Sequence, residues 1–198
     1  MARRYLLRRR AERQDRTHRR IVEAVVALHQ EIGPARTTIS AIAERAGVQR
    51  LTVYRHFPDE TALYRACKAC FDEMHPPPDP TQWERIEDPA ARLGSALGQL
   101  YAHFRATEAM MANIHRDAPQ VPAIGPVLAT VAPYWARVSA VLLVGWDVPA
   151  EERPLLAAAV GHALEFHTWR GLVRHQGLTD DQAVALMVRL VACATAPP

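Results

Sequence analysis

The sequence is poor in the features that define several common protein classes. It holds three cysteines, an odd number that does not make a disulfide framework and that fits a reducing compartment. None of its apolar runs approaches the roughly 20 residues of a membrane span, and the arginine-rich N-terminus lacks the apolar core of a signal peptide. We therefore expect a cytoplasmic protein that does not enter a membrane.

Patterns of catalytic residues are also missing. The sequence has no serine, histidine and acid set in a recognisable frame, no glycine-rich phosphate loop and no prominent pair of carboxylates. His162 and Glu165 offer only two metal ligands, and His167 lies about 140° around a helix from His162. We expect no enzymatic activity, no cofactor and no metal.

Cys67 and Cys70 form a single CxxC pair on a predicted helix. A zinc site would need four ligands in suitable spacing, and a redox pair normally accompanies a βαβ pattern that this chain lacks. A structural role is the simpler interpretation, and thiol sensing is the alternative.

Positive charge is concentrated at the N-terminus. Residues 1–20 hold nine arginines against Glu12 and Asp15, a local net charge of +7. Because the whole chain is at +3, the remaining residues together carry −4. Such a basic arm favours a polyanion as partner, either nucleic acid or an anionic membrane surface, although a solvated tail would look the same. We expect residues 1–15 to be a flexible basic arm.

Apolar residues recur three and four positions apart along nearly the whole chain, whereas strand-like alternation is almost absent. This periodicity predicts an all-α fold of about nine helices. The first helix should begin after Thr17 as N-cap and stop at Gly33, and the proline run at 74–80 should end the fourth. The expected later helices are 88–107, a short one around 110–114, 123–144 with a kink at Pro133, 150–175, and 180–194 after Thr179.

The stretch ISAIAERAGVQRLTVYRHF, residues 39–57, contains two short helical patterns joined at Gly47. A helix-turn-helix needs a small residue where its helices nearly touch, a glycine in the turn and apolar residues facing inward. The residues that fill these places are Ala43, Gly47, Ile42, Ala46, Val48, Val53 and Phe57. The second helix would then be available to enter a DNA major groove, with Gln49 and Arg50 nearest the base edges.

From Thr37 through IAERAGVQRLTVYRHFPDETAL the sequence resembles the TetR family of transcriptional regulators, and the Tyr-x-His-Phe ending is specific. The resemblance implies an all-helical homodimer with an N-terminal three-helix DNA-binding domain and a larger domain that binds an effector and dimerises. We accordingly expect the DNA-binding domain at 16–58, a connecting helix at 59–75, and an effector-binding and dimerisation domain at 76–198.

The resemblance also implies roles for single residues. Thr38 should cap the second helix and touch phosphate, Tyr54 and His56 should contact the DNA backbone, and Gln49, Arg50 and Thr52 should reach into the groove. The predicted DNA interface is Thr38, Ser40, Gln49, Arg50, Thr52, Tyr54, Arg55, His56, Arg16 and Arg19.

Three positions depart from the family pattern. Gln49, a poor cap, replaces the usual serine, and Leu51 stands where glycine, proline or alanine is common. Asp59 and Glu60 occupy the region where a lysine often begins the fourth helix. The missing cation removes one phosphate contact, for which the basic arm would compensate.

The C-terminal region resembles the family only in layout, so its residues are interpreted alone. Methionine and aromatic residues at helical spacing are usually core, but an apolar wall with a few polar groups is also typical of a small-molecule pocket. His162, Phe166 and Trp169 are predicted to share one helix face. The pocket candidates are Tyr101, His103, Phe104, Met111, Trp135, His162, Phe166 and Trp169.

The last two predicted helices carry apolar stripes that could form a four-helix bundle with a second copy. The residues of these stripes are Leu156, Val160, Ala163, Leu164, Val184, Met187, Leu190 and Val191. Taken together, the sequence predicts a dimeric repressor that binds a palindromic double-stranded operator and responds to a small, largely apolar effector. The alternatives are a regulator without effector that senses thiols through Cys67 and Cys70, and a non-specific polyanion-binding protein.

Overall fold

A computed structural model describes residues 2–194, with the side chains of residue 9 and of residues 11–194. The described residues form helices and turns without strands, which confirms the all-α prediction. The chain folds into two compact units: Met1–Pro76 with Ala109–Thr130, and Pro77–Glu108 with Val131–Pro198. The chain first leaves unit 1 between Pro76 and Pro77, inside the proline run, but residues 109–130 return to that unit.

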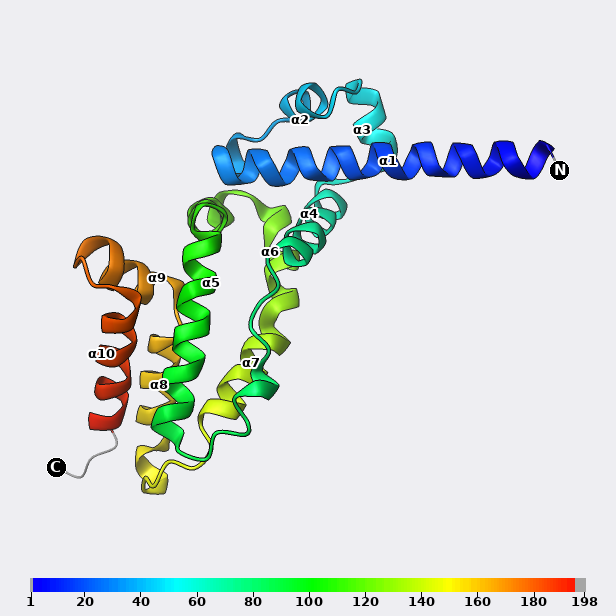
Figure 1. The fold of residues 1–198 in the computed structure, drawn as a ribbon. Coiled ribbons are helices and arrows are strands. Elements are labelled where there is room, and N and C mark those ends of the chain that lie inside the picture. Colours follow the sequence, from blue (N-terminus) through cyan, green and yellow to red (C-terminus); the bar gives the residue numbers. More distant parts are fainter. Residues whose placement is uncertain (1, 195–198) are drawn as a thin grey trace. The chain divides into compact units, whose positions relative to one another are not determined.

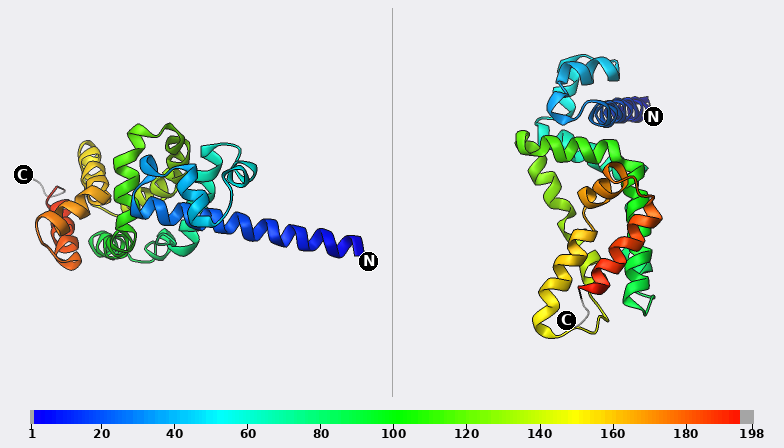
Figure 2. Two further views of the ribbon diagram at one scale, coloured as in Figure 1. Left: turned by 90° about the horizontal axis from the view of Figure 1, so that it is seen from above. Right: turned by 90° about the vertical axis from the view of Figure 1, so that its left-hand side faces the viewer.

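Helix α1 spans Ala2–Glu31 and is a single straight helix in Figures 1 and 2. Its first half extends beyond the other helices of unit 1, so the segment that we expected to be a flexible arm is helical. Thr17 is not an N-cap, because its Oγ1 donates to the Arg13 carbonyl 2.9 Å away inside the helix. The sequence has no glycine or proline before Gly33, so nothing interrupts the helix earlier. Gly33, at φ 88°, ends it as predicted.

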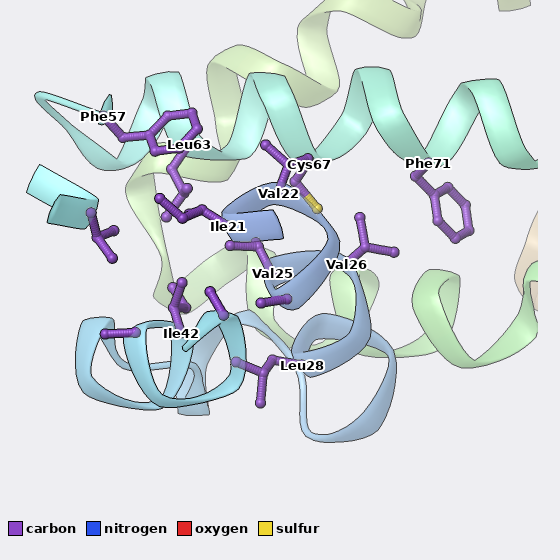
Figure 3. Packing of buried hydrophobic residues seen from close by; sticks show 14 of the residues in the cluster. Ile21, Val22, Val25, Val26, Leu28, Ile42, Phe57, Leu63, Cys67 and Phe71 are labelled. Carbon is purple, nitrogen blue, oxygen red and sulfur yellow. The ribbon is translucent and has the colours of Figure 1, made fainter. Parts of the chain in front are cut away.

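The rest of the N-terminal half of unit 1 consists of short helices packed on α1. They are the 3-10 turn η1 (Pro34–Arg36) and the helices α2 (Ile39–Ala46), α3 (Arg50–His56) and α4 (Glu60–Met74). Figure 3 shows the core that they share with α1, including Ile21, Val25, Ile42, Phe57 and Leu63. Asp59 caps α4: its Oδ1 accepts from the backbone N–H of Ala62 at 2.7 Å.

Helix α5 is continuous from Pro89 to Asp117, where we expected two helices. Asp88 caps its start by accepting from the Ala91 N–H at 2.7 Å. The predicted break near Thr107 is absent because the Thr107 hydroxyl donates to the His103 carbonyl within the helix, 2.7 Å away. After α5, unit 1 continues through the turns η3 (Ala118–Gln120) and η4 (Pro122–Ile124) and helix α6 (Gly125–Leu128), and it ends within η5 (Ala129–Val131).

Within unit 1, side chains from the last turns of α5 form hydrogen bonds with the end of α1 and the turn after it. The Asn113 amide donates to the carbonyls of His29 and Gln30, both at 2.9 Å. Asp117 accepts from the Ala35 N–H at 3.0 Å, and Arg116 donates to the Asp117 carboxylate at 2.6 Å. Orphan carbonyls at a helix end need such partners, so residues far along the sequence complete the turn that leads into α2.

Unit 2 is built around the first part of α5. Its other elements are η2 (Pro80–Gln82), α7 (Ala132–Leu142), η6 (Ala150–Glu152), α8 (Arg153–Ala163), α9 (Phe166–Arg170), the π-helix η7 (Gly171–His175) and α10 (Asp180–Cys193). Thr179 caps α10 in a capping box with Gln182, as its position predicted. Two expected long helices are broken: the turn η5 precedes Pro133, which lies in the first turn of α7, and Leu164 and Glu165 separate α8 from α9.

We expect buried His29 on α1 to make the stability of unit 1 pH-dependent. Its side chain is 1% exposed, its Nδ1 lies 3.5 Å from the Cys67 Sγ, and its ring stacks on Tyr64. Burial lowers the pKa of His29 to about 4, and Asp117 only partly opposes this shift. Between that value and the ordinary pKa of about 6.5, the unfolded chain binds a proton that the folded chain does not.

We expect the free energy of unfolding of unit 1 to fall as the pH drops from about 6.5 to about 4, by a total of about 3 kcal/mol. Urea unfolding at several pH values measures this dependence. His29→Leu and His29→Gln both remove the titrating group, so both should flatten the curve in this window even if each lowers stability at neutral pH. A wild-type slope in both variants would contradict the assignment.

Candidate nucleic-acid interface

The turn between α2 and α3 is held by a glycine and a distant arginine. Gly47 adopts a left-handed conformation (φ 62°, ψ 42°), and the N–H of Val48 donates to the Ala43 carbonyl at 2.9 Å. Arg20 of α1 donates to the carbonyls of Ala46 and Gly47. A Cβ atom at residue 47 would lie 2.7 Å from the Arg20 Nη2. The left-handed backbone therefore favours glycine here, and a Cβ atom would also displace the end of the Arg20 side chain from the turn.

Helix α3 buries one side and exposes the other. Val53 and Phe57 are 1% and 5% exposed, while Leu51 and Tyr54 are 74% and 51% exposed. The residues predicted to face inward from α2 and α3 are buried, except that Val48 is partly buried. The helix-turn-helix therefore has the predicted inner side, and the outer side of α3 is available to a partner.

The ten predicted DNA-binding residues lie on accessible parts of α1, α2 and α3. Thr38 caps α2 as the resemblance implied, its Oγ1 accepting from the Ala41 N–H at 3.1 Å. Gln49 makes no side-chain cap of α3, which agrees with its poor capping ability. Thr52 and His56 are half-buried, and the other members are exposed: Thr38, Ser40, Gln49, Arg50, Tyr54, Arg55, Arg16 and Arg19.

His56 is less suited to a cationic phosphate contact than its type suggests. Burial, with His18 and Arg55 nearby, lowers its pKa. Its ring meets the His18 ring edge-on with centroids 6.0 Å apart, and His18 in turn packs on Phe57 at 4.8 Å.

Two residues that matter for this surface were missed from sequence. Arg20 was one of nine arginines in the basic segment, and nothing in its spacing distinguishes a turn-capping side chain from a phosphate-binding one. Leu51 was noted only as a departure from a family pattern. An apolar residue between Arg50 and Thr52, on a helix whose inner side was already assigned, was a usable signal of an exposed leucine.

The eight pocket candidates do not behave as one group. Four aromatic residues form a packed core in unit 2: Tyr101, Phe104, Phe166 and Trp169 are at most 4% exposed. Phe104 is their centre, with the ring centroids of Phe166 and Trp169 at 5.7 and 6.0 Å. His103 and Trp135 are half-buried beside it.

His162 and Met111 are not part of this aromatic core. His162 ends up exposed on α8, whereas Phe166 and Trp169 are buried on α9. The prediction that these three residues share one helix face is therefore wrong, because the chain bends between the two helices. Met111 belongs to unit 1.

The two cysteines of the CxxC pair are poorly placed for redox sensing. Cys67 is buried, and burial raises the pKa of its thiol to about 12. The pKa of half-buried Cys70 is also raised, first by burial and then by Glu23 and Glu73. Since the thiolate is the reactive form, these surroundings disfavour the thiol-sensing alternative. Among the described residues no cluster of three histidine, cysteine or acidic side chains could hold a metal, and none of the helices there is long and apolar enough to cross a membrane.

Comparison with known proteins shows what the helix-turn-helix region resembles. Residues 21–67, which run from the buried half of α1 into α4, match the family described as "Bacterial regulatory proteins, tetR family". Over 70 residues the chain is 37% identical to the HTH-type transcriptional regulator TtgR of Pseudomonas putida, and equally to the probable regulator ArpR of the same species. The aligned segment is 35% of this chain. The chain thus spans about a third (33%) of the length of the two relatives that it matches.

Solved structures share the fold across most of the chain. A putative fatty acid metabolism regulator of Clostridium perfringens aligns with a TM-score of 0.65 at 15% identity, covering 90% of this chain and 100% of that one. A TetR-like regulator of Rhodococcus sp. RHA1 gives a TM-score of 0.62 at 18% identity, covering 89% and 93%. The sequence similarity to TetR-type regulators thus lies in the helix-turn-helix region, and the likeness across the rest of the chain is one of fold.

Proposed function

We propose that the protein is a transcriptional regulator that reads a palindromic DNA operator as a homodimer, with α3 in the major groove. The observation that carries this proposal is that α3 is buried on one side and exposed on the other, within a helix-turn-helix that matches a family of regulators. Val53 and Phe57 hold the helix while Arg50, Tyr54 and Arg55 remain exposed. Arginine offers the paired donors that fit guanine O6 and N7 in the major groove.

The basic residues of α1 support the same partner. Arg16 and Arg19 are exposed on the helix that carries the helix-turn-helix, and such side chains supply the sequence-independent part of DNA affinity. Arg20 has a different role, because its guanidinium is bound to the α2–α3 turn. A purely electrostatic polyanion binder would not require a groove-reading helix, so we place that alternative second.

Selection from a pool of random duplexes tests the proposal. We expect a palindromic preference with half-site centres about 34 to 36 Å apart and binding at least about a thousandfold tighter than to bulk DNA at physiological salt. Equal affinity for every duplex would leave only the electrostatic alternative.

On the selected duplex, Arg50→Ala should cost roughly 1 to 3 kcal/mol of binding free energy and relax the preference at one symmetric pair of positions. Tyr54→Phe should instead weaken all sequences about equally, because its hydroxyl is assigned to phosphate. Arg45→Ala is the matched control, since Arg45 is exposed but paired with Glu31 outside the predicted interface. If Arg50→Ala lowered the affinity for every duplex by the same factor, base readout by this residue would be excluded.

Of the interface residues that the sequence indicated, the proposed homodimer keeps Leu190 and replaces most of the others. Six of the eight predicted interface residues are core within one chain: Leu156, Val160, Ala163, Leu164, Met187 and Val191. Their burial follows from the packing of α8 against α10. Leu190 remains 52% exposed, and Leu155 of α8 is 57% exposed.

Both helices carry a second stripe that the chain itself does not bury. On α8 the spacing i, i+3, i+7 places Leu155, Ala158 and His162 on one face, and on α10 Leu190 and Cys193 share a face. Small and apolar residues in these stripes would let two copies pair their α8 and α10 helices in a four-helix bundle.

We expect a dimer by sedimentation at micromolar concentration, and monomers when Leu155→Glu and Leu190→Glu are combined, because carboxylates would be buried in the bundle. Leu128→Glu, at an exposed leucine of unit 1, should leave the dimer intact. A monomeric wild-type protein would contradict the proposal.

The finer part of the proposal is repression controlled by a small, largely apolar effector. A dimer bound across two grooves blocks access to the DNA beneath it, and an effector that binds one dimer conformation better would shift the population. The support is the aromatic group of unit 2, where half-buried Trp135 lies beside buried Phe104 with ring centroids 6.5 Å apart.

Screening small apolar compounds for release of the selected duplex tests this part. Trp135→Ala should weaken the response to an active compound at least severalfold while DNA binding without the compound stays unchanged. Trp146→Ala, which removes a half-buried tryptophan elsewhere in unit 2, is the control. If a broad library changes neither duplex affinity nor tryptophan fluorescence, regulation by such an effector is contradicted.

A further inference from the structure

Leu51 is the most exposed of the large apolar side chains recorded in the described part of the chain, at 74%. It occupies the second position of α3. Its sequence neighbours on that turn are the polar residues Gln49, Arg50 and Thr52. Gln49 and Arg50 are exposed, and Thr52 is half-buried. The exposed leucine is therefore a single apolar group within a polar surface, not the edge of the hydrophobic core.

Its direction follows from helix geometry. At about 100° per residue, Leu51 lies about 160° from Val53, which is 1% exposed. Leu51 is thus opposite the side that packs on the rest of unit 1. Tyr54 and Arg55, three and four positions later, lie on the same outer side, and both are exposed.

We propose that Leu51 contacts the 5-methyl group of a thymine in each operator half-site and so determines sequence preference there. The inference rests on the proposed function, which puts the outer side of α3 in the major groove. Thymine is the base that presents a methyl group in that groove, and apolar side chains recognise it by direct contact. Covering the leucine and the methyl together removes apolar surface of both from water.

The position in the helix suits this contact better than a structural role. Leu51 is in the N-terminal turn, the part of a recognition helix that lies nearest the base edges, next to Arg50, which is proposed to read guanine. An exposed side chain contributes little to the stability of the free protein. Leu51→Ala should therefore fold normally and report on binding alone.

The experiment uses the full-length protein and its selected duplex, in which thymines are replaced by deoxyuridine one symmetric pair at a time. This change removes the 5-methyl group and leaves the hydrogen-bonding edge of the base unchanged. At one pair of positions we expect about a fourfold loss of affinity per methyl group, the effect of exposing one buried methyl. At the other thymines the loss should be absent.

A double-mutant cycle assigns that loss to Leu51. Leu51→Ala should bind the thymine duplex more weakly and no longer distinguish it from the deoxyuridine duplex. Leu51→Met, which keeps an apolar side chain of similar volume, should retain most of the distinction. Leu128→Ala, at an exposed leucine of α6 in the same unit, should behave as wild type.

The possible failures are distinguishable. If wild-type protein selects no preferred duplex, the proposed function itself fails. If it selects one but Leu51→Ala keeps the full thymine preference, the assignment of Leu51 is overturned while the function stands. A change of oligomeric state in Leu51→Ala with unaltered thymine preference would instead place the side chain in a contact between copies, and would also overturn the inference.

Discussion

The outer surface of α3 depends on the burial of two side chains on its inner side. A helix of seven residues is not stable alone in water, and α3 has no side-chain cap at its start. Val53 and Phe57 supply the anchoring by packing into the core with Ile21, Val25 and Ile42. Because one side is fixed in this way, the opposite side is held in a defined orientation without being covered.

Two polar arrangements fix the path of the chain into and out of α2. At the start, Asn113 and Asp117 bind the end of α1 and the turn after it. At the end, Arg20 binds the carbonyls of the Gly47 turn. Side chains distant in sequence thus hold the turns at both ends of α2, so we expect substitution at these positions to disturb the proposed DNA reading without removing a proposed DNA contact.

Much of the fold was predictable because its signals are local. Asp59, Asp88 and Thr179 cap the helices that follow them, and Gly33 and Gly47 end the helices before them, as their residue types predict. The inner side of the helix-turn-helix was likewise predictable from spacing, which fixes the relative directions of side chains on short helices.

The errors arose where contacts between distant residues determine where a helix ends or what an apolar stripe packs against. The bend after α8 has no glycine or proline, and there the Tyr101 hydroxyl donates to the Ala163 carbonyl at 2.9 Å, a contact between residues far apart in sequence. The apolar stripes of α8 and α10 were correctly recognised, but periodicity cannot say whether a stripe packs within one chain or against a second copy. For the same reason Phe104 and Trp169 could be a pocket wall or a core until their burial was known.

The central claim is that α3 reads base edges in the major groove, and methylation interference on the selected duplex tests it most directly. Methyl groups on guanine N7 project into the major groove, whereas those on adenine N3 project into the minor groove. We predict that N7 methylation blocks binding at two clusters one helical turn apart, and that N3 methylation within these clusters does not. Binding that is insensitive to N7 methylation, or sensitive only to N3 methylation, would contradict the account.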